Sequence, residues 1–84
     1  MDIKEQFNKA AIDVKSLDSR PDNATLLKLY ALFKQGSSGD ITGDRPGGFD
    51  FKGAAKYDAW MELKGKDSAE AMQEYIDLVN SLLG

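Results

Sequence analysis

The groups that could do chemistry in this chain are lysines, carboxylates and aromatic rings, because the sequence has no histidine and no cysteine. Their absence removes the commonest general base, thiolate nucleophiles, disulfides and most zinc sites. Tyr30 and Lys34 stand four residues apart, as do Lys52 and Lys56, so each pair shares one face of a helix. If the two helices pack together, their ammonium groups and rings converge on one surface, which suits a phosphorylated ligand with a planar base. The alternative is that these lysines are ordinary solvated charges.

No other constellation predicts catalysis or metal binding. Asp58 and Glu62 have helical spacing and could share a proton or a divalent ion, but a solvated helix face is the preferred explanation. Ser37 and Ser38 have no partner base, and the stretch GDRPGG lacks the Gly-Lys-Ser/Thr ending of a phosphate-binding loop. We therefore expect no catalytic residue and no metal ligand.

Length and charge limit the remaining possibilities. With 84 residues, of which 42% are hydrophobic, the chain is expected to form a single domain over residues 1–84. A net charge of -3 opposes general attraction to nucleic acid or to an anionic membrane. The longest apolar run, residues 29–33, is far shorter than the roughly 20 residues that span a bilayer. The first residues resemble no signal peptide, so we expect a complete cytoplasmic protein without stable membrane insertion.

The first two predicted helices lie on either side of Pro21. Apolar residues at spacings of three and four predict a helix from Ile3 to Leu17, with Asp2 and Glu5 as a capping pair. A second helix is predicted to start after Asp22 or Asn23 and to end at Gln35, with Gly36 as the left-handed stop. Its apolar residues cover more of its circumference than one packing stripe requires. Packing on two sides explains this pattern, and contact between part of its surface and an apolar ligand is a second, compatible explanation.

The second half predicts a long loop and two more helices. The glycine-rich segment from Gly36 to Asp50 is a loop long enough to cross the end of a bundle, which would make its flanking helices parallel. The third helix is predicted from Asp50 as N-cap to Lys64 and Gly65, and the fourth from Asp67, with Glu70 completing a capping box. The predicted fold is therefore an all-α four-helix bundle.

At these residues the sequence resembles the acyl-CoA-binding protein family, also called diazepam-binding inhibitor, over nearly the whole chain. The stretches that carry the resemblance are KAAIDVKSL, LYALFKQ, GDITGDRPG, DFKGAAKYDAW, LKG and AMQEYI, in family order. The resemblance implies an up-down-down-up bundle with the long loop between the second and third helices. It also implies an intracellular, monomeric carrier that binds medium- to long-chain fatty acyl-CoA without turnover, with no cofactor and with transient contacts to acyl-CoA-using enzymes.

The resemblance also implies which residues contact the ligand. In the family, a tyrosine and a lysine of the second helix and a lysine of the third contact the ribose 3'-phosphate, and these match Tyr30, Lys34 and Lys56. Further family contacts match Lys15 for the coenzyme, Tyr75 near the ligand, and Ala11 and Leu27 beside the acyl chain. Phe33 replaces the family's usual second tyrosine and is expected to stack on adenine without a hydroxyl hydrogen bond.

Other departures from the family are expected to change local packing and to weaken or slow binding at most, without loss of function. Tyr57 replaces the usual tryptophan after the third-helix lysine, and Gly36, Gly43 and Gly48 replace larger residues, which should loosen the loop. The alternative function is a helical protein-interaction module or a signalling-peptide precursor, in which the apolar second helix docks a partner.

Overall fold

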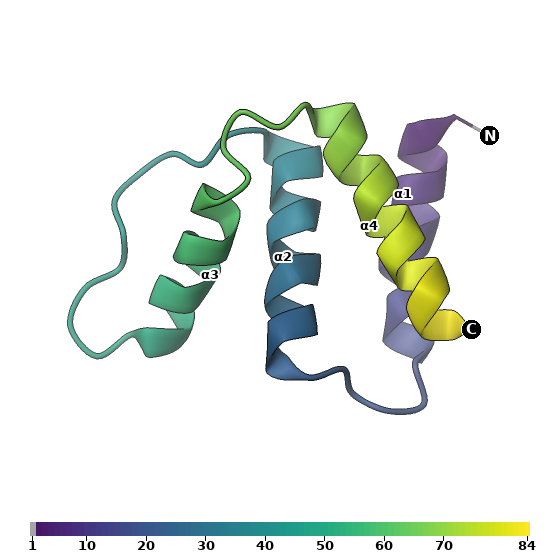
Figure 1. Cartoon of the computed structure of the whole chain (residues 1–84), viewed down its shortest axis with the longest axis horizontal. Coiled ribbons are helices and arrows are strands. Elements are labelled where there is room, and N and C mark those ends of the chain that lie inside the picture. The colour runs from purple at the N-terminus through teal and green to yellow at the C-terminus, as the bar shows by residue number, and fades with distance from the viewer. Residues whose placement is uncertain (1) are drawn as a thin grey trace.

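The computed structural model describes residues 2–84, and within this range the chain is helical and contains no strand. The described residues form four α-helices, which Figure 1 labels, and a short 3₁₀ turn, here called η1, that continues the first helix. In chain order the elements are α1 (Ile3–Asp13), η1 (Val14–Ser16), α2 (Asn23–Ser38), α3 (Phe51–Met61) and α4 (Ser68–Leu83).

Three of the four helix starts are fixed by an aspartate that precedes the first turn. The carboxylates of Asp2, Asp22 and Asp50 accept hydrogen bonds from backbone N–H groups three residues later, at 2.8–2.9 Å. These bonds satisfy donors that have no partner inside the helix, as the sequence predicted. Asp67 is the N-cap of α4, but its side chain makes no capping hydrogen bond, so the predicted capping box with Glu70 is wrong.

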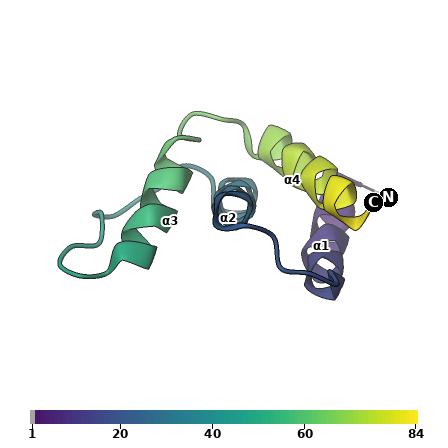
Figure 2. The ribbon, with the colours of Figure 1, turned by 60° about the horizontal axis from the view of Figure 1, so that its bottom comes forward.

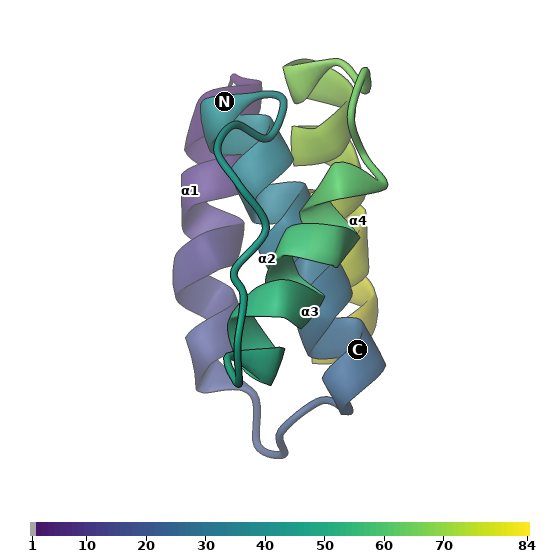
Figure 3. The same ribbon diagram turned by 90° about the vertical axis from the view of Figure 1, so that its left-hand side faces the viewer.

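The helices have the predicted up-down-down-up order. In Figure 1, α1 and α4 run downward, whereas α2 and α3 both run upward. The parallel pair is possible because the loop over residues 39–50 returns the chain along the length of α3, as Figure 3 shows. Figure 2 shows α2 between α3 on one side and the α1–α4 pair on the other. The second helix is therefore packed on two sides, one of the two explanations for its apolar circumference.

The core lies among α1, α2 and α4. Its fully buried members include Leu32 on α2 and Val79 on α4, which are 1% and 0% exposed. Phe7, Ala10, Leu29, Ala71, Met72, Tyr75 and Ile76 complete this cluster. Burying large apolar side chains is the main favourable term in folding, so this three-helix core supplies most of the stability of the bundle.

The predicted end of the second helix is wrong by one turn. Gly36 is helical and buried, and α2 continues through Ser38 to Gly39, whose φ of 79° provides the left-handed stop. A Cβ at position 36 would lie 3.0 Å from Met72 Cγ and 3.1 Å from Phe7 Cζ. Gly36 therefore serves close packing between helices, and the expectation that it loosens the loop is wrong. Gly43 and Gly48 do lie in the loop, with positive φ, and their effect on its mobility stays a prediction.

The first and third helices end earlier than predicted. The α-helical part of α1 stops at Asp13, and η1 carries the chain to Leu17. After Met61 the backbone continues in three-residue turns, and Gly65 turns the chain with a φ of 91°. This segment is held by tertiary contacts, because the Gly65 N–H donates to Asp40 and the Lys66 carbonyl accepts from Gln35. Helical periodicity alone does not reveal such contacts.

Candidate ligand-binding site

The seam between α2 and α3 brings three of the predicted ligand residues together. Lys56 Nζ of α3 lies 5.3 Å from the ring centroid of Tyr30 on α2. One turn further along both helices, Lys34 Nζ of α2 lies 5.1 Å from the Trp60 ring of α3. These reciprocal cation–π contacts place Tyr30, Lys34 and Lys56 on one face of the parallel pair.

An open apolar groove adjoins this seam. It has a volume of about 360 Å³ and its floor is formed by Leu26 and Leu27 of α2 and Ala55 of α3. Phe51 stands at one end, and Tyr30 and Lys56 stand at the other. Beyond these two residues a second hollow of about 220 Å³ continues past Tyr57 and Trp60 to the long loop. An apolar groove thus continues into a surface that carries aromatic and cationic side chains.

Four lysines near this surface lack a carboxylate partner. Within residues 2–84 the ion pairs are Lys9–Asp13, Arg45–Asp58 and Lys66–Glu74, and none of them uses a lysine of the seam or groove. Among the lysines without such a partner are Lys15, Lys34, Lys52 and Lys56. Uncompensated ammonium groups on one side of an acidic protein form a local site for an anion, and phosphate is a strong acceptor for them.

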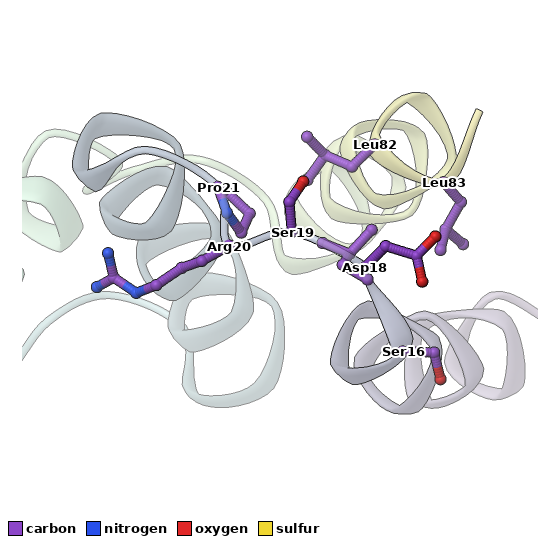
Figure 4. Close-up of a pocket in the computed structure, with 8 residues that line it drawn as sticks. Ser16, Asp18, Ser19, Arg20, Pro21, Leu82 and Leu83 are labelled. Atoms are coloured by element: carbon purple, nitrogen blue, oxygen red, sulfur yellow. The ribbon is translucent and has the colours of Figure 1, made fainter.

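Lys15 reaches the groove only through its neighbours. It lines a separate cleft of about 390 Å³ with Arg20 and Leu26, and these two residues also line the groove. Arg20 belongs to the connector between η1 and α2. In Figure 4 its side chain points away from Leu82 and Leu83, which border a further cavity of about 410 Å³ on the α4 side of the connector. Arg20 was not among the residues predicted to bind ligand, and its position in an irregular connector gave no periodic signal.

Phe33 and Tyr75 lie in an aromatic cluster rather than in the groove. Phe33 stacks on Phe7 at 5.2 Å between ring centroids, and Tyr75 lies 5.2 Å from Phe7 and 5.8 Å from Phe33. Tyr75 is only 4% exposed, and burial raises the pKa of its phenol above the ordinary value of 10. Phe33 retains 36% of its surface, so part of its side chain is accessible to solvent. Ala11 packs against the same core and does not line the groove that contains Leu27.

A buried amide holds the upper end of the seam in place. Gln35 is 0% exposed, and its Oε1 accepts from the Trp60 indole N–H at 3.0 Å. Its Nε2 donates to Asp40 and to the Lys66 carbonyl, each at 2.8 Å. The Asp40 carboxylate also accepts from the Gly65 N–H, and these bonds lower its pKa, the Gly65 bond most. Sequence reasoning missed Gln35 as the junction of α2, α3 and the loop, because nothing in its spacing distinguishes a buried glutamine.

The long loop is attached to α3 by polar contacts. Arg45 donates two hydrogen bonds to the Asp58 carboxylate, at 2.9 and 3.0 Å, and this pair lowers the pKa of Asp58. The Tyr57 hydroxyl donates to the Gly43 carbonyl at 3.1 Å. The carboxylate that could have joined Glu62 in acid–base chemistry is therefore engaged by Arg45. Tyr57, which stands where the family has a tryptophan, uses its hydroxyl to hold the loop.

The described residues contain no group of three or more metal-ligating side chains, and none of their helices is long and apolar enough to cross a membrane. The site combines ammonium groups, ring faces and an apolar channel, which together fit an amphiphile with an anionic head.

Comparison with known proteins defines the class of this bundle. The family model for "Acyl CoA binding protein" matches residues 4–79. An acyl-CoA-binding protein homolog of Drosophila melanogaster is 53% identical over 96% of this chain and 94% of its own length. Homolog 1 of Caenorhabditis elegans is 53% identical over 92% of this chain and 90% of its own length. The chain belongs to the acyl-CoA-binding protein family.

Solved structures agree with this assignment. The crystal structure of Oryza sativa acyl-CoA-binding protein 2 superposes with a TM-score of 0.92, at 40% identity, over 98% of this chain and 91% of the rice protein. The solution structure of the yeast acyl coenzyme A binding protein gives a TM-score of 0.74, at 43% identity, over 92% of this chain and 90% of its own. The predicted fold class and family are thereby confirmed.

Proposed function

We propose that this protein is a carrier that binds medium- to long-chain fatty acyl-CoA thioesters at the α2–α3 seam, and buffers and transports them without catalysis. The observation that carries the proposal is that two lysines of the seam have no carboxylate partner: Lys56, which lines an apolar groove of about 360 Å³, and Lys34, one turn further along the seam. Family membership supports it independently, since the relatives above are named for binding acyl-CoA.

The two ends of the ligand would contribute differently. Burying a methylene is worth about 0.8 kcal/mol, so an acyl chain of about fourteen methylenes contributes on the order of 10 kcal/mol before ordering costs. In this proposal Leu27 and the groove floor receive the tail. Lys34, Lys56 and Tyr30 receive phosphate, and the exposed part of Phe33 stacks on the adenine. The head group thus provides selectivity, because a fatty acid carboxylate cannot replace several phosphate oxygens.

Lys15, Tyr75 and Ala11 have weaker geometric support as ligand contacts. Lys15 can meet the coenzyme through the cleft that it shares with Arg20. Tyr75 and Ala11 lie against the α1–α2–α4 core, so their effect on binding is proposed to come from holding Phe7 and Phe33 in position.

Calorimetry separates these contributions. Palmitoyl-CoA should bind one to one, palmitate and free coenzyme A far more weakly, and Lys34→Ala or Lys56→Ala should weaken palmitoyl-CoA binding by roughly 1 to 3 kcal/mol. Lys28→Ala is the matched control, because Lys28 is an exposed α2 lysine outside the groove. Equal affinity for palmitate and its thioester would contradict the head-group role.

The remaining features of the proposal are a monomeric, single-domain, cytoplasmic protein that needs no cofactor or metal and meets acyl-CoA-using enzymes transiently. The lack of cysteine is compatible with a reducing compartment. The alternative, a helical interaction module or signalling-peptide precursor, has no observation of equal specificity in its favour. Incubation with palmitoyl-CoA should release no free thiol, and release at a rate above the buffer control would indicate a thioesterase instead.

A further inference from the structure

The apolar groove between α2 and α3 carries cationic side chains at both of its ends. At the end that continues into the seam, Lys56 lies over the Tyr30 ring. The opposite end lies where α2 and α3 begin, at the bottom of Figure 1, and its lining residues are Arg20, Asn23, Phe51 and Lys52. A rise of about 1.5 Å per residue separates the two ends by roughly 10 Å along α2. The phosphates of the proposed ligand explain the cation at the first end, but a hydrocarbon tail that ends in a methyl group explains no cation at the second.

The two cations at this far end have no carboxylate partner. None of the ion pairs within residues 2–84 includes Arg20 or Lys52. The aspartates nearest to them in the sequence, Asp22 and Asp50, accept hydrogen bonds from backbone N–H groups in the first turns of α2 and α3. Figure 4 shows the Arg20 side chain pointing away from the connector residues and α4. The positive charges are therefore available to a ligand in the groove.

Arg20 also retains most of its hydrogen-bonding capacity. One of its terminal nitrogens donates to the Asn23 side-chain oxygen at 3.4 Å, which directs the guanidinium toward the start of α2. A guanidinium has several more N–H donors, and its planar fork matches the two oxygens of a carboxylate. Charge-assisted hydrogen bonds of this kind are stronger than neutral ones. The far end of the groove thus has the chemistry of a carboxylate site.

The groove can receive a carboxylate there without burying it completely. An ionised carboxylate inside a closed apolar channel would be strongly disfavoured. Here the methylenes of a chain would contact Leu26 and Leu27, whereas its end would lie beside Phe51 and Lys52, which are both exposed. A carboxylate in this position keeps part of its hydration and gains two cationic neighbours.

We propose that the protein also binds acyl-CoA thioesters whose acyl chain ends in a second carboxylate, and that Arg20 and Lys52 receive this carboxylate. The inference rests on the proposed function, because the thioester and the methylenes use the same seam and groove. It adds a class of ligand, the dicarboxylic acyl chain, to the fatty acyl chains with a methyl end. The net charge of -3 opposes any additional anion, so a preference for such ligands requires these local cations.

Calorimetry with a matched pair of ligands tests the proposal on the whole chain. Hexadecanedioyl-CoA and palmitoyl-CoA have acyl chains of equal length and differ only at the terminal carbon. Arg20→Gln removes the charge and should weaken binding of hexadecanedioyl-CoA about tenfold more than binding of palmitoyl-CoA. Arg20→Lys should retain most of this difference, and Lys52→Gln should show a smaller effect in the same direction. Lys28→Gln is the matched control, because Lys28 is exposed on α2 outside the groove.

Chain length locates the second carboxylate. In a series from octanedioyl-CoA to hexadecanedioyl-CoA, each compared with its methyl-ended counterpart, the effect of Arg20→Gln should be small for the shortest chain. It should increase as the chain becomes long enough to reach the start of α2. Sodium chloride should reduce the effect, because the far end of the groove is open to solvent.

The outcomes separate this inference from the proposed function. If palmitoyl-CoA binds and Arg20→Gln weakens both ligands equally, the inference is wrong and the proposed function stands, since Arg20 would then act on the coenzyme that both ligands share. An effect as large for octanedioyl-CoA as for hexadecanedioyl-CoA would also overturn it. Absence of binding by both hexadecanedioyl-CoA and palmitoyl-CoA would overturn the inference and the proposed function together.

Discussion

The α1–α2–α4 half of the molecule and the α2–α3 half are held together by different kinds of contact. The first half buries Phe7, Leu32 and Val79 in a continuous apolar core. In the second half, α3 buries only Ala54, and it is joined to α2 by lysine–ring contacts, by the Gln35 amide and by a loop attached through Arg45. Apolar packing gives more stability than exposed polar contacts, so the first half should resist unfolding and the second should open more easily. Stability and binding are thus assigned to different sides of α2.

The largest expected difference between the halves is in the free energy of unfolding. Leu32→Ala removes a side chain that is 1% exposed, and should destabilise the fold by about 2 to 5 kcal/mol. Leu27→Ala, at the half-exposed groove floor, should cost clearly less stability while weakening palmitoyl-CoA binding. Urea denaturation of both variants measures the stability difference. Equal destabilisation would mean that the α2–α3 half is part of the same rigid core.

Bound ligand should reduce the difference in stability between the two halves. At a concentration of 100 times its dissociation constant, palmitoyl-CoA should stabilise the native state by about 2.7 kcal/mol. Because the proposed contacts lie on α2 and α3, amide hydrogen exchange should slow more over residues 51–61 than over residues 3–13. A uniform slowing along the chain would instead indicate that α3 opens only when the whole bundle unfolds.

Gln35 should be the most sensitive polar residue of the second half. Gln35→Leu leaves the Lys66 carbonyl and the Asp40 carboxylate without their amide donor, and should cost about 1 to 3 kcal/mol of stability. Gln73→Leu is the control, since Gln73 is exposed and donates only to Asp77. Thermal denaturation measures the stability of both variants. If Gln35→Leu lost no more stability than Gln73→Leu, the hydrogen bonds of Gln35 would contribute little to the stability of the fold.

The smallest effect on stability is expected for the loop over residues 39–50. Hydrogen bonds from Arg45 hold the pKa of Asp58 below its ordinary value of 3.8, so the pair's contribution is present above about pH 4. It is lost as the pH falls through the lowered pKa and the carboxylate takes up a proton. Asp58→Asn at neutral pH should therefore reproduce the acid state, with faster hydrogen exchange over residues 39–50 and little change in global stability. Unchanged exchange in the loop would contradict its attachment through this pair.

The fold could be predicted from the sequence where one local signal decided the structure. The aspartates before α1, α2 and α3 and the apolar stripe of α4 determine helix starts and the buried face within a few residues. The end of the second helix was predicted wrongly at Gly36, because a glycine near a helix end looks the same in sequence whether it ends the helix or allows a neighbouring helix to pack closely. Only Met72 and Phe7, distant in sequence, distinguish the two.

The candidate site could be predicted only where a local sequence signal was present. Spacing paired Tyr30 with Lys34 and Lys52 with Lys56, and the family resemblance assigned Tyr30, Lys34 and Lys56 to the phosphate. The way that each lysine lies over a ring of the opposite helix depends on tertiary packing. Arg20 and Gln35 gave no signal, since one lies in a connector and the other is a polar residue whose partners come from three separate segments. The position of Phe33 against Phe7 and Tyr75 likewise follows from helix packing and not from its identity alone.

The contact of Lys34 with Trp60 gives the protein an internal optical reporter. Trp60 is the only tryptophan, its indole N–H is fixed by Gln35 and the Gly39 carbonyl, and a positive charge stands over its ring. A phosphate that draws this ammonium away changes the electric field at the indole but leaves its hydrogen bonds in place. Emission from a single unlabelled chromophore should then follow site occupancy in real time, and Lys34→Ala should abolish most of that response.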